Sequence, residues 1–143
     1  MPWPSCPPCR PDTPQTRAPA YRLAFADPDF SALAASAPTV LRGGLSPLPE
    51  TAAEVQDVAL ALGAGKGAVH LGAGASEKAF KAEDLRGLGT LYFATHGLVS
   101  GDQVGEGALD EPALALTPGQ GEDGFLTASE IAELQLDAGL VVL

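Results

Sequence analysis

Short apolar segments and longer segments with helical spacing follow one another along the chain. The short segments are rich in apolar or β-branched residues, which is typical of strands. They cover residues 21–25, 67–71, 90–95, 112–116 and 140–143. Residues 90–95 are nearly continuous in such side chains, as expected of a strand that is covered on both faces.

The clearest helix is expected to begin at Thr51. Thr51 and Glu54 form a T-x-x-E capping box, in which the two side chains bind free backbone amides of the first turn. Apolar residues then recur at helical spacing on one face up to Leu62. Gly63 and Gly65 come next, and glycine is preferred just past the end of a helix. The pattern therefore predicts one amphipathic helix between these signals.

Two shorter helices are predicted further along the chain. Ser76 can cap a helix that continues to about Arg86. Thr127 and Glu130 repeat the capping box at the start of another helix. The order of strands and helices predicts an α/β fold, with a mainly parallel sheet and helices on both of its faces.

The two ends of the chain differ from its middle. Residues 1–19 are rich in proline and lack periodicity, so we expect them to be disordered, and residues 20–143 to form one domain. Residues 140–143 begin a buried strand with nothing after it, although a parallel strand needs cover on both faces. We therefore expect a fragment whose sheet is incomplete (truncated) at the C-terminus. Its exposed apolar edge would favour self-association.

The charge balance limits the partners of the chain. The formal net charge is −10 and the pI is about 4.4, whereas binding to nucleic acid or to an anionic membrane needs clustered Lys and Arg. No apolar run approaches the ~20 residues that cross a bilayer, and no secretory signal is seen. We expect a cytoplasmic protein that binds neither nucleic acid nor membrane. The acidic, Gly-rich residues 100–110 are expected to form a mobile surface loop.

His96 is the strongest candidate for chemistry. It lies one residue past the predicted buried strand 90–95, and open α/β sheets place functional groups at the carboxyl ends of their strands. An imidazole can act as a general base near neutral pH. Gly97 follows at once and leaves its backbone amide accessible. His70, by contrast, lies inside a short strand with no glycine after it, so we expect a structural role there.

The two cysteines, Cys6 and Cys9, are poor candidates for a reactive pair. A redox C-x-x-C follows a strand and opens a helix, but here prolines surround both residues. A zinc site would need a second pair of ligands, and none is present. We assign these cysteines no function.

Cofactor sites are weakly indicated. Gly72 and Gly74 lie between a strand and a helix, as in a dinucleotide-binding turn, but Glu77 stands where the third glycine belongs and would repel a pyrophosphate. Residues 63–67 resemble a P-loop only superficially, since they follow a helix. The acidic residues are scattered through loops without the spacing of a calcium loop. We expect neither a cofactor nor a metal. Those acidic residues include Asp102, Glu106, Asp110, Glu122 and Asp123.

A series of short motifs, in this order, resembles the CHAT domain, a caspase-like family of cysteine peptidases often fused to TPR repeats. The match begins near residue 21 and continues to the last residue. The motifs are Leu-Pro-Glu-Thr at 48–51, Phe-Ala-Thr-His-Gly at 93–97, Glu-Pro-Ala-Leu-Ala-Leu at 111–116, Asp-Gly-Phe-Leu-Thr-Ala-Ser-Glu-Ile at 123–131, Leu-Gln-Leu at 134–136 and Leu-Val-Val-Leu at 140–143.

The resemblance implies a caspase-haemoglobinase type fold and a His–Cys dyad. His96 matches the family's histidine, and Gly97 matches the glycine whose amide helps to form the oxyanion hole. Residues 140–143 match the strand that leads to the nucleophile, which in the family lies in a Ser-Ala-Cys-like sequence just beyond it. No cysteine follows here.

The chain is therefore expected to be the N-terminal part of a CHAT-type cysteine endopeptidase for protein or peptide substrates, inactive alone. The resemblance also implies a TPR-containing region or partner. The alternative is a peptidase-derived interaction module that binds a partner protein without catalysis.

Overall fold

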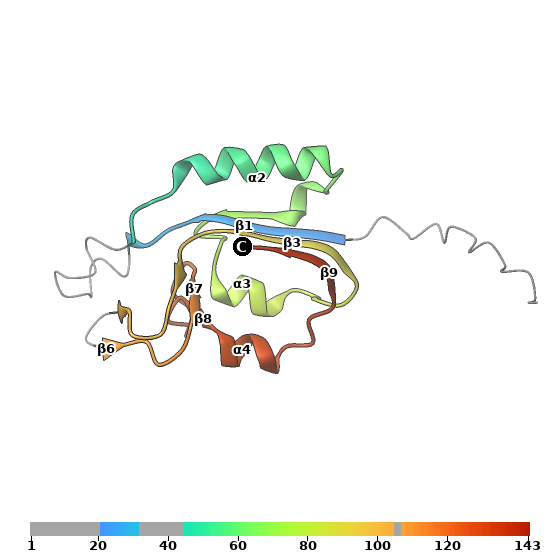
Figure 1. Cartoon of the computed structure of the whole chain (residues 1–143). Coiled ribbons are helices and arrows are strands. Elements are labelled where there is room, and N and C mark those ends of the chain that lie inside the picture. Colours follow the sequence, from blue (N-terminus) through green and yellow to red (C-terminus); the bar gives the residue numbers. More distant parts are fainter. Residues whose placement is uncertain (1–20, 32–44, 105–106) are drawn as a thin grey trace, which may run out of the picture.

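A computed structural model of the chain describes residues 21–31, 45–104 and 107–143 (Figure 1). The expected disorder of residues 1–19 lies outside the described residues, as do both cysteines.

A parallel sheet of four strands forms the centre of the fold. Its strands are β1 (Tyr21–Pro28), β2 (Val69–Gly72), β3 (Leu88–Ala94) and β9 (Ala138–Val142), in the order β2-β1-β3-β9. Every neighbouring pair is parallel. The prediction of a mainly parallel sheet is therefore confirmed, and all the strands present their carboxyl ends at the same edge of the sheet.

Helices cover both faces of this sheet, as the sequence predicted. Helix α2 (Pro49–Ala61) lies on one face, and α3 (Glu77–Ala82) and α4 (Ala128–Glu133) lie on the other (Figure 1). A short 3₁₀ helix, η2 (Lys66–Ala68), precedes β2. Among the helices of the described ranges, none is both long and apolar enough to cross a bilayer.

The two faces of β1 explain why the two halves of the core differ in size. Successive side chains of a strand point to opposite faces. Phe25 therefore joins Phe80 and Phe93 in a large cluster on the side of α3 and α4. Ala24 lies opposite and contributes to a smaller cluster around Val55 of α2. The alternation of large and small residues in β1 thus places the thicker half of the core beneath α3 and α4.

A second sheet packs beside the carboxyl end of β3. It contains β4 (Gly97–Leu98), β7 (Ala113–Ala115) and β8 (Phe125–Thr127), all antiparallel. A separate hairpin is made by β5 (Gln103–Val104) and β6 (Gly107–Ala108).

Part of the segment 100–110, which we expected to form a mobile surface loop, has paired backbone. Gly101 donates its N–H to the carbonyl of Leu109 at 2.8 Å, and Leu109 donates to the carbonyl of Asp102 at 2.9 Å. Gly101 has φ +94°, which glycine adopts easily, and this lets the chain turn into the paired segment. Because residues 100–110 contain few apolar side chains, their sequence gave no sign of this backbone pairing.

The capping box predicted at Thr51 is wrong. Helix α2 begins at Pro49, with Leu48 as a cap that uses no side chain. The Thr51 hydroxyl instead donates to the Leu48 carbonyl at 2.7 Å and accepts the N–H of Asp27, 24 positions away, at 3.1 Å. Proline at the first helical positions is favourable because its fixed φ suits a helix start. The hydroxyl therefore joins α2 to the end of β1.

The other two predicted caps are confirmed. The Ser76 hydroxyl accepts the N–H of Ala79, and Thr127 with Glu130 forms a complete capping box. Helix α3 ends sooner than expected, at Ala82, because Glu83 takes an extended backbone with ψ 152°.

Candidate functional site

The structure places His96 just beyond the carboxyl end of β3, where the second sheet begins. Its carbonyl accepts the N–H of Ala115 in β7 at 2.9 Å. The hydroxyl of the preceding Thr95 donates a short hydrogen bond to the Ala115 carbonyl. Two bonds to one residue of β7 therefore fix the backbone that carries the histidine.

The imidazole of His96 has a defined orientation. Its Nε2 lies 2.8 Å from the carbonyl oxygen of Ser46, and its ring lies 5.7 Å from that of Phe30 at 46°. A carbonyl oxygen can only accept a hydrogen bond, so the neutral ring carries its proton on Nε2. Nδ1 then holds the lone pair. The contact with Ser46 thus makes Nδ1 the nitrogen that can take a proton from a nucleophile.

Gly97 lies next to the imidazole with its amide directed outward. In an antiparallel ladder, hydrogen-bonded pairs alternate with unbonded pairs. The bond from Ala115 to His96 makes that pair a bonded one, so the next pair, Gly97 with Leu114, is unbonded. The Gly97 N–H therefore points away from β7 and can be used as a donor. A Cβ at Gly97 would meet nothing within 4 Å in the described part of the chain.

An apolar groove of about 530 Å³ has Gly97, Val141 and Leu143 among its lining residues. Its walls come from β3, the second sheet, α4 and β9, and include Leu98, Leu114, Ile131 and Val141. Strand β9 is the edge of the parallel sheet, and its residues Leu140 and Val141 are 56% and 43% exposed. The His96 end of the sheet therefore adjoins an open apolar surface.

His70 lies in a different environment from His96. Its ring stacks on Phe25 at 4.5 Å, in the core on the face of α3. Its buried Nε2 is 3.2 Å from a carboxylate oxygen of Glu83, at ion-pair distance although not aligned as a hydrogen bond. This packing agrees with the structural role expected for His70.

The glycines considered for nucleotide binding make a turn. The N–H groups of Gly74 and Ala75 donate within it, to the carbonyls of Leu71 and Gly72, both at 2.9 Å. A Cβ at Gly74 would lie 3.2 Å from the Leu71 oxygen, which explains the glycine. Glu77 follows with a side chain that is 1% exposed. These two amides are therefore already bonded within the turn, and the neighbouring Glu77 is acidic, so the turn is not suited to bind a phosphate.

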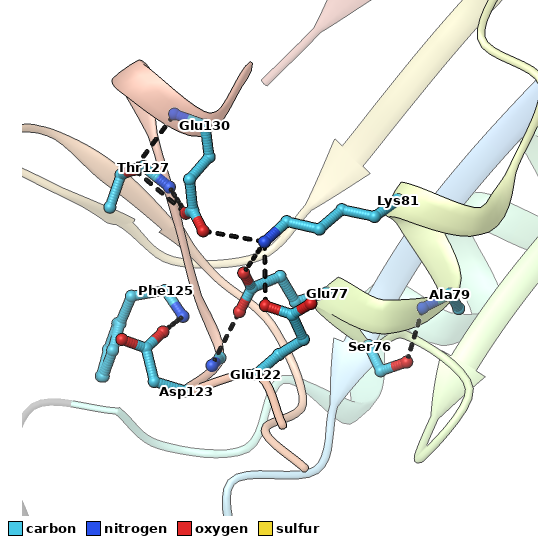
Figure 2. A network of polar contacts seen from close by, with 10 residues as sticks. Ser76, Glu77, Ala79, Lys81, Glu122, Asp123, Phe125, Thr127 and Glu130 are labelled. Atoms are coloured by element: carbon cyan, nitrogen blue, oxygen red, sulfur yellow. Dashed lines mark hydrogen bonds and ion pairs between the residues drawn. The ribbon is translucent and has the colours of Figure 1, made fainter. Parts of the chain in front are cut away.

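Sequence reasoning missed a cluster of charges around Lys81 (Figure 2). Its ammonium lies 2.6 Å from Glu77, 2.8 Å from Glu122 and 2.8 Å from Glu130. The second carboxylate oxygen of Glu77 accepts the N–H of Gly124 at 2.9 Å. The only signal in the sequence was the i,i+4 spacing of Glu77 and Lys81. The cluster joins α3 to the loop before β8 and to α4.

The carboxylates of this cluster lie within 4.8 Å of one another, a spacing that could suit a cation, and the Lys81 ammonium occupies the space among them. Burial raises the pKa of Glu77. Partial burial acts to raise the pKa of Glu130 as well, but hydrogen bonds from Lys81 and Thr127 lower it to about 2. The same ion pairs outweigh burial and raise the pKa of Lys81. The ion pairs of the cluster therefore hold α3, the loop before β8 and α4 together.

We predict that Glu130→Gln makes the free energy of unfolding depend less on pH between pH 7 and pH 3. The folded pKa of about 2 lies below the ordinary value of 4.5, so the contribution of Glu130 is complete above about pH 4.5 and is lost as the pH falls toward 2. Glu77, with its raised pKa, acts in the opposite sense. Urea unfolding from pH 7 to pH 3 measures the effect. The control, Glu133→Gln on an exposed position of α4, should keep the wild-type slope; equal slopes in both variants would contradict the prediction.

Comparison with known proteins gives one family. The family model described as CHAT domain matches residues 5–143 of the chain. No curated protein and no solved structure matches.

Proposed function

The chain belongs to the CHAT domain family of peptidase-like proteins, and on that basis we propose that His96 and Gly97 are the histidine and an oxyanion-hole donor of a cysteine-peptidase-type site. The proposed substrate is a peptide bond in a protein or peptide. The observation that carries the proposal is the contact between Nε2 of His96 and the Ser46 carbonyl, because it leaves Nδ1 as the proton acceptor.

In the proposed mechanism, a cysteine thiol gives its proton to Nδ1 of His96. The thiolate sulfur then bonds to the carbonyl carbon of the substrate, and the oxygen takes up the electron pair. The Gly97 N–H donates to this oxyanion. As the C–N bond breaks, His96 returns the proton to the leaving amine, and water later hydrolyses the thioester.

The register of the sheet supports a nucleophile next to His96. Tyr92 of β3 pairs with Val142 of β9, and the strands run in parallel. A residue four positions past Val142 in the same register would be level with His96. Neighbouring strands lie about 4.8 Å apart, which is within reach of a thiol and an imidazole.

The residues that the structure describes contain no cysteine, since the two cysteines of the chain are Cys6 and Cys9. We infer that these 143 residues supply the histidine half of the site and do not hydrolyse peptides by themselves.

This inference predicts no turnover by the purified chain. Incubation with a mixture of denatured proteins and peptides, followed by mass spectrometry, should give no cleavage above the buffer control, because none of the residues that the structure describes offers a thiol to His96. Turnover that is lost in His96→Ala and kept in His70→Ala would contradict the prediction, since it would show a complete site.

The alternative function is a peptidase-derived interaction module whose partner could carry TPR repeats. The exposed apolar residues of β9 and the adjoining groove favour it, since open strand edges and apolar patches bind other chains. The two functions differ at His96. Catalysis requires the imidazole of His96, whereas binding of a partner through the apolar surface of β9 does not, so His96→Ala should leave such binding unchanged.

A further inference from the structure

We propose that Thr117 is a positioning residue for His96, acting through Phe30. The inference rests on the proposed function of His96. A buried hydroxyl two residues past β7 would then hold the ring that packs against the imidazole.

Thr117 lies at the junction of the carboxyl ends of β1 and β2. It is 8% exposed, and its hydroxyl makes two hydrogen bonds of 2.8 Å. It accepts the N–H of Asp29, 88 positions away, and donates to the carbonyl of Gly72. A hydroxyl is needed because the same atom must both accept and donate. A valine of the same shape would leave two partly buried backbone groups without their partner.

The same short segment also holds the backbone of His96. Residues 113–117 run from β7 to Thr117, and Ala115 within them binds the carbonyl of His96. Thr117 itself donates its N–H to the carbonyl of Ala75 at 2.9 Å. This segment therefore braces the carboxyl ends of β1, β2 and β3 against one another.

Phe30 is the link between this brace and the imidazole. It follows Asp29 directly and is 6% exposed, with its ring 5.7 Å from that of His96. Ser46 binds Nε2 of His96. The Asp29–Thr117 bond fixes the start of the segment that carries Phe30, so its loss should loosen the packing of Phe30 on the imidazole.

Carbethoxylation of the full chain by diethyl pyrocarbonate, followed site by site with mass spectrometry, tests the proposal. The reagent attacks the neutral imidazole, and the chain has two histidines, so His70 is an internal reference. In Thr117→Val the rate of carbethoxylation at His96 should rise about fivefold. The loss of one hydrogen bond changes the population of conformations with a loosened imidazole by about this factor. Thr117→Ser, which keeps the hydroxyl, should restore the wild-type rate.

Thr127→Val is the matched control, because it removes a partly buried threonine hydroxyl from the α4 cap. It should leave the ratio of the His96 rate to the His70 rate unchanged. If Thr117→Val unfolds the chain, the rates at His96 and His70 rise together. Phe30→Leu then tests the packing on the imidazole, because it keeps the hydroxyl of Thr117. A rise confined to His96 in that variant supports the proposal.

An unchanged His96 rate in Thr117→Val would overturn the inference, as would an unchanged rate in Phe30→Leu or an equal rise in Thr127→Val. These outcomes are separate from the failure of the proposed function. The reaction reports how the ring is held, whether or not the imidazole can activate a thiol.

Discussion

Replacing Lys81 by methionine is expected to lower the free energy of unfolding by on the order of 3 kcal/mol, the usual cost of removing one partner from a buried ion pair. The ammonium contacts three carboxylates, and the Glu77 side chain among them is only 1% exposed. Methionine keeps the length of the side chain and removes the charge. Glu77, Glu122 and Glu130 would then repel one another without a counter-ion. Urea unfolding at pH 7, followed by circular dichroism, measures the change.

Arg86→Met is the matched control for this prediction. Arg86 also pairs with a carboxylate, that of Asp84, at 2.8 Å, but both side chains are about two-thirds exposed. Solvent screens such a pair, so its loss should hardly change the midpoint of unfolding. Adding Glu77→Gln to Lys81→Met should recover part of the stability, since it removes the buried charge. If Lys81→Met behaved like Arg86→Met, the cluster would not hold α3 to α4.

Much of the fold follows from local patterns in the sequence. The near-continuous apolar run in β3 and the capping residues Ser76 and Thr127 predicted their elements correctly. The prediction at Thr51 failed because a proline two residues earlier starts the helix and because the hydroxyl binds the distant Asp27 amide. A capping motif cannot show that a tertiary partner competes for the same hydroxyl.

The candidate site was only partly predictable for the same reason. His96 and Gly97 stood out by their place after a strand and by the motif around them. The groups that hold the histidine did not stand out. Ser46 contributes a backbone carbonyl, which any residue has, from 50 positions away. The Lys81 cluster joins residues 41 and 49 positions apart. No local spacing encodes such contacts.

The proposed function requires His96 to activate a thiol at the carboxyl end of β9. Appending Ser-Ala-Cys after Leu143 puts a cysteine level with His96 if the register of Tyr92 with Val142 continues. The pair should favour thiolate and imidazolium, which lowers the pKa of the thiol from about 8.5 to below about 7.5. Appending Ser-Cys-Ala shifts the thiol by one residue and turns it to the opposite face, so it is the matched control.

The pH dependence of alkylation of the appended cysteine by iodoacetamide, resolved from Cys6 and Cys9 by mass spectrometry, measures this pKa directly. We expect a pKa below about 7.5 that returns to about 8.5 in His96→Ala and stays low in His70→Ala. A pKa near 8.5 with His96 present, unchanged in His96→Ala, would contradict it.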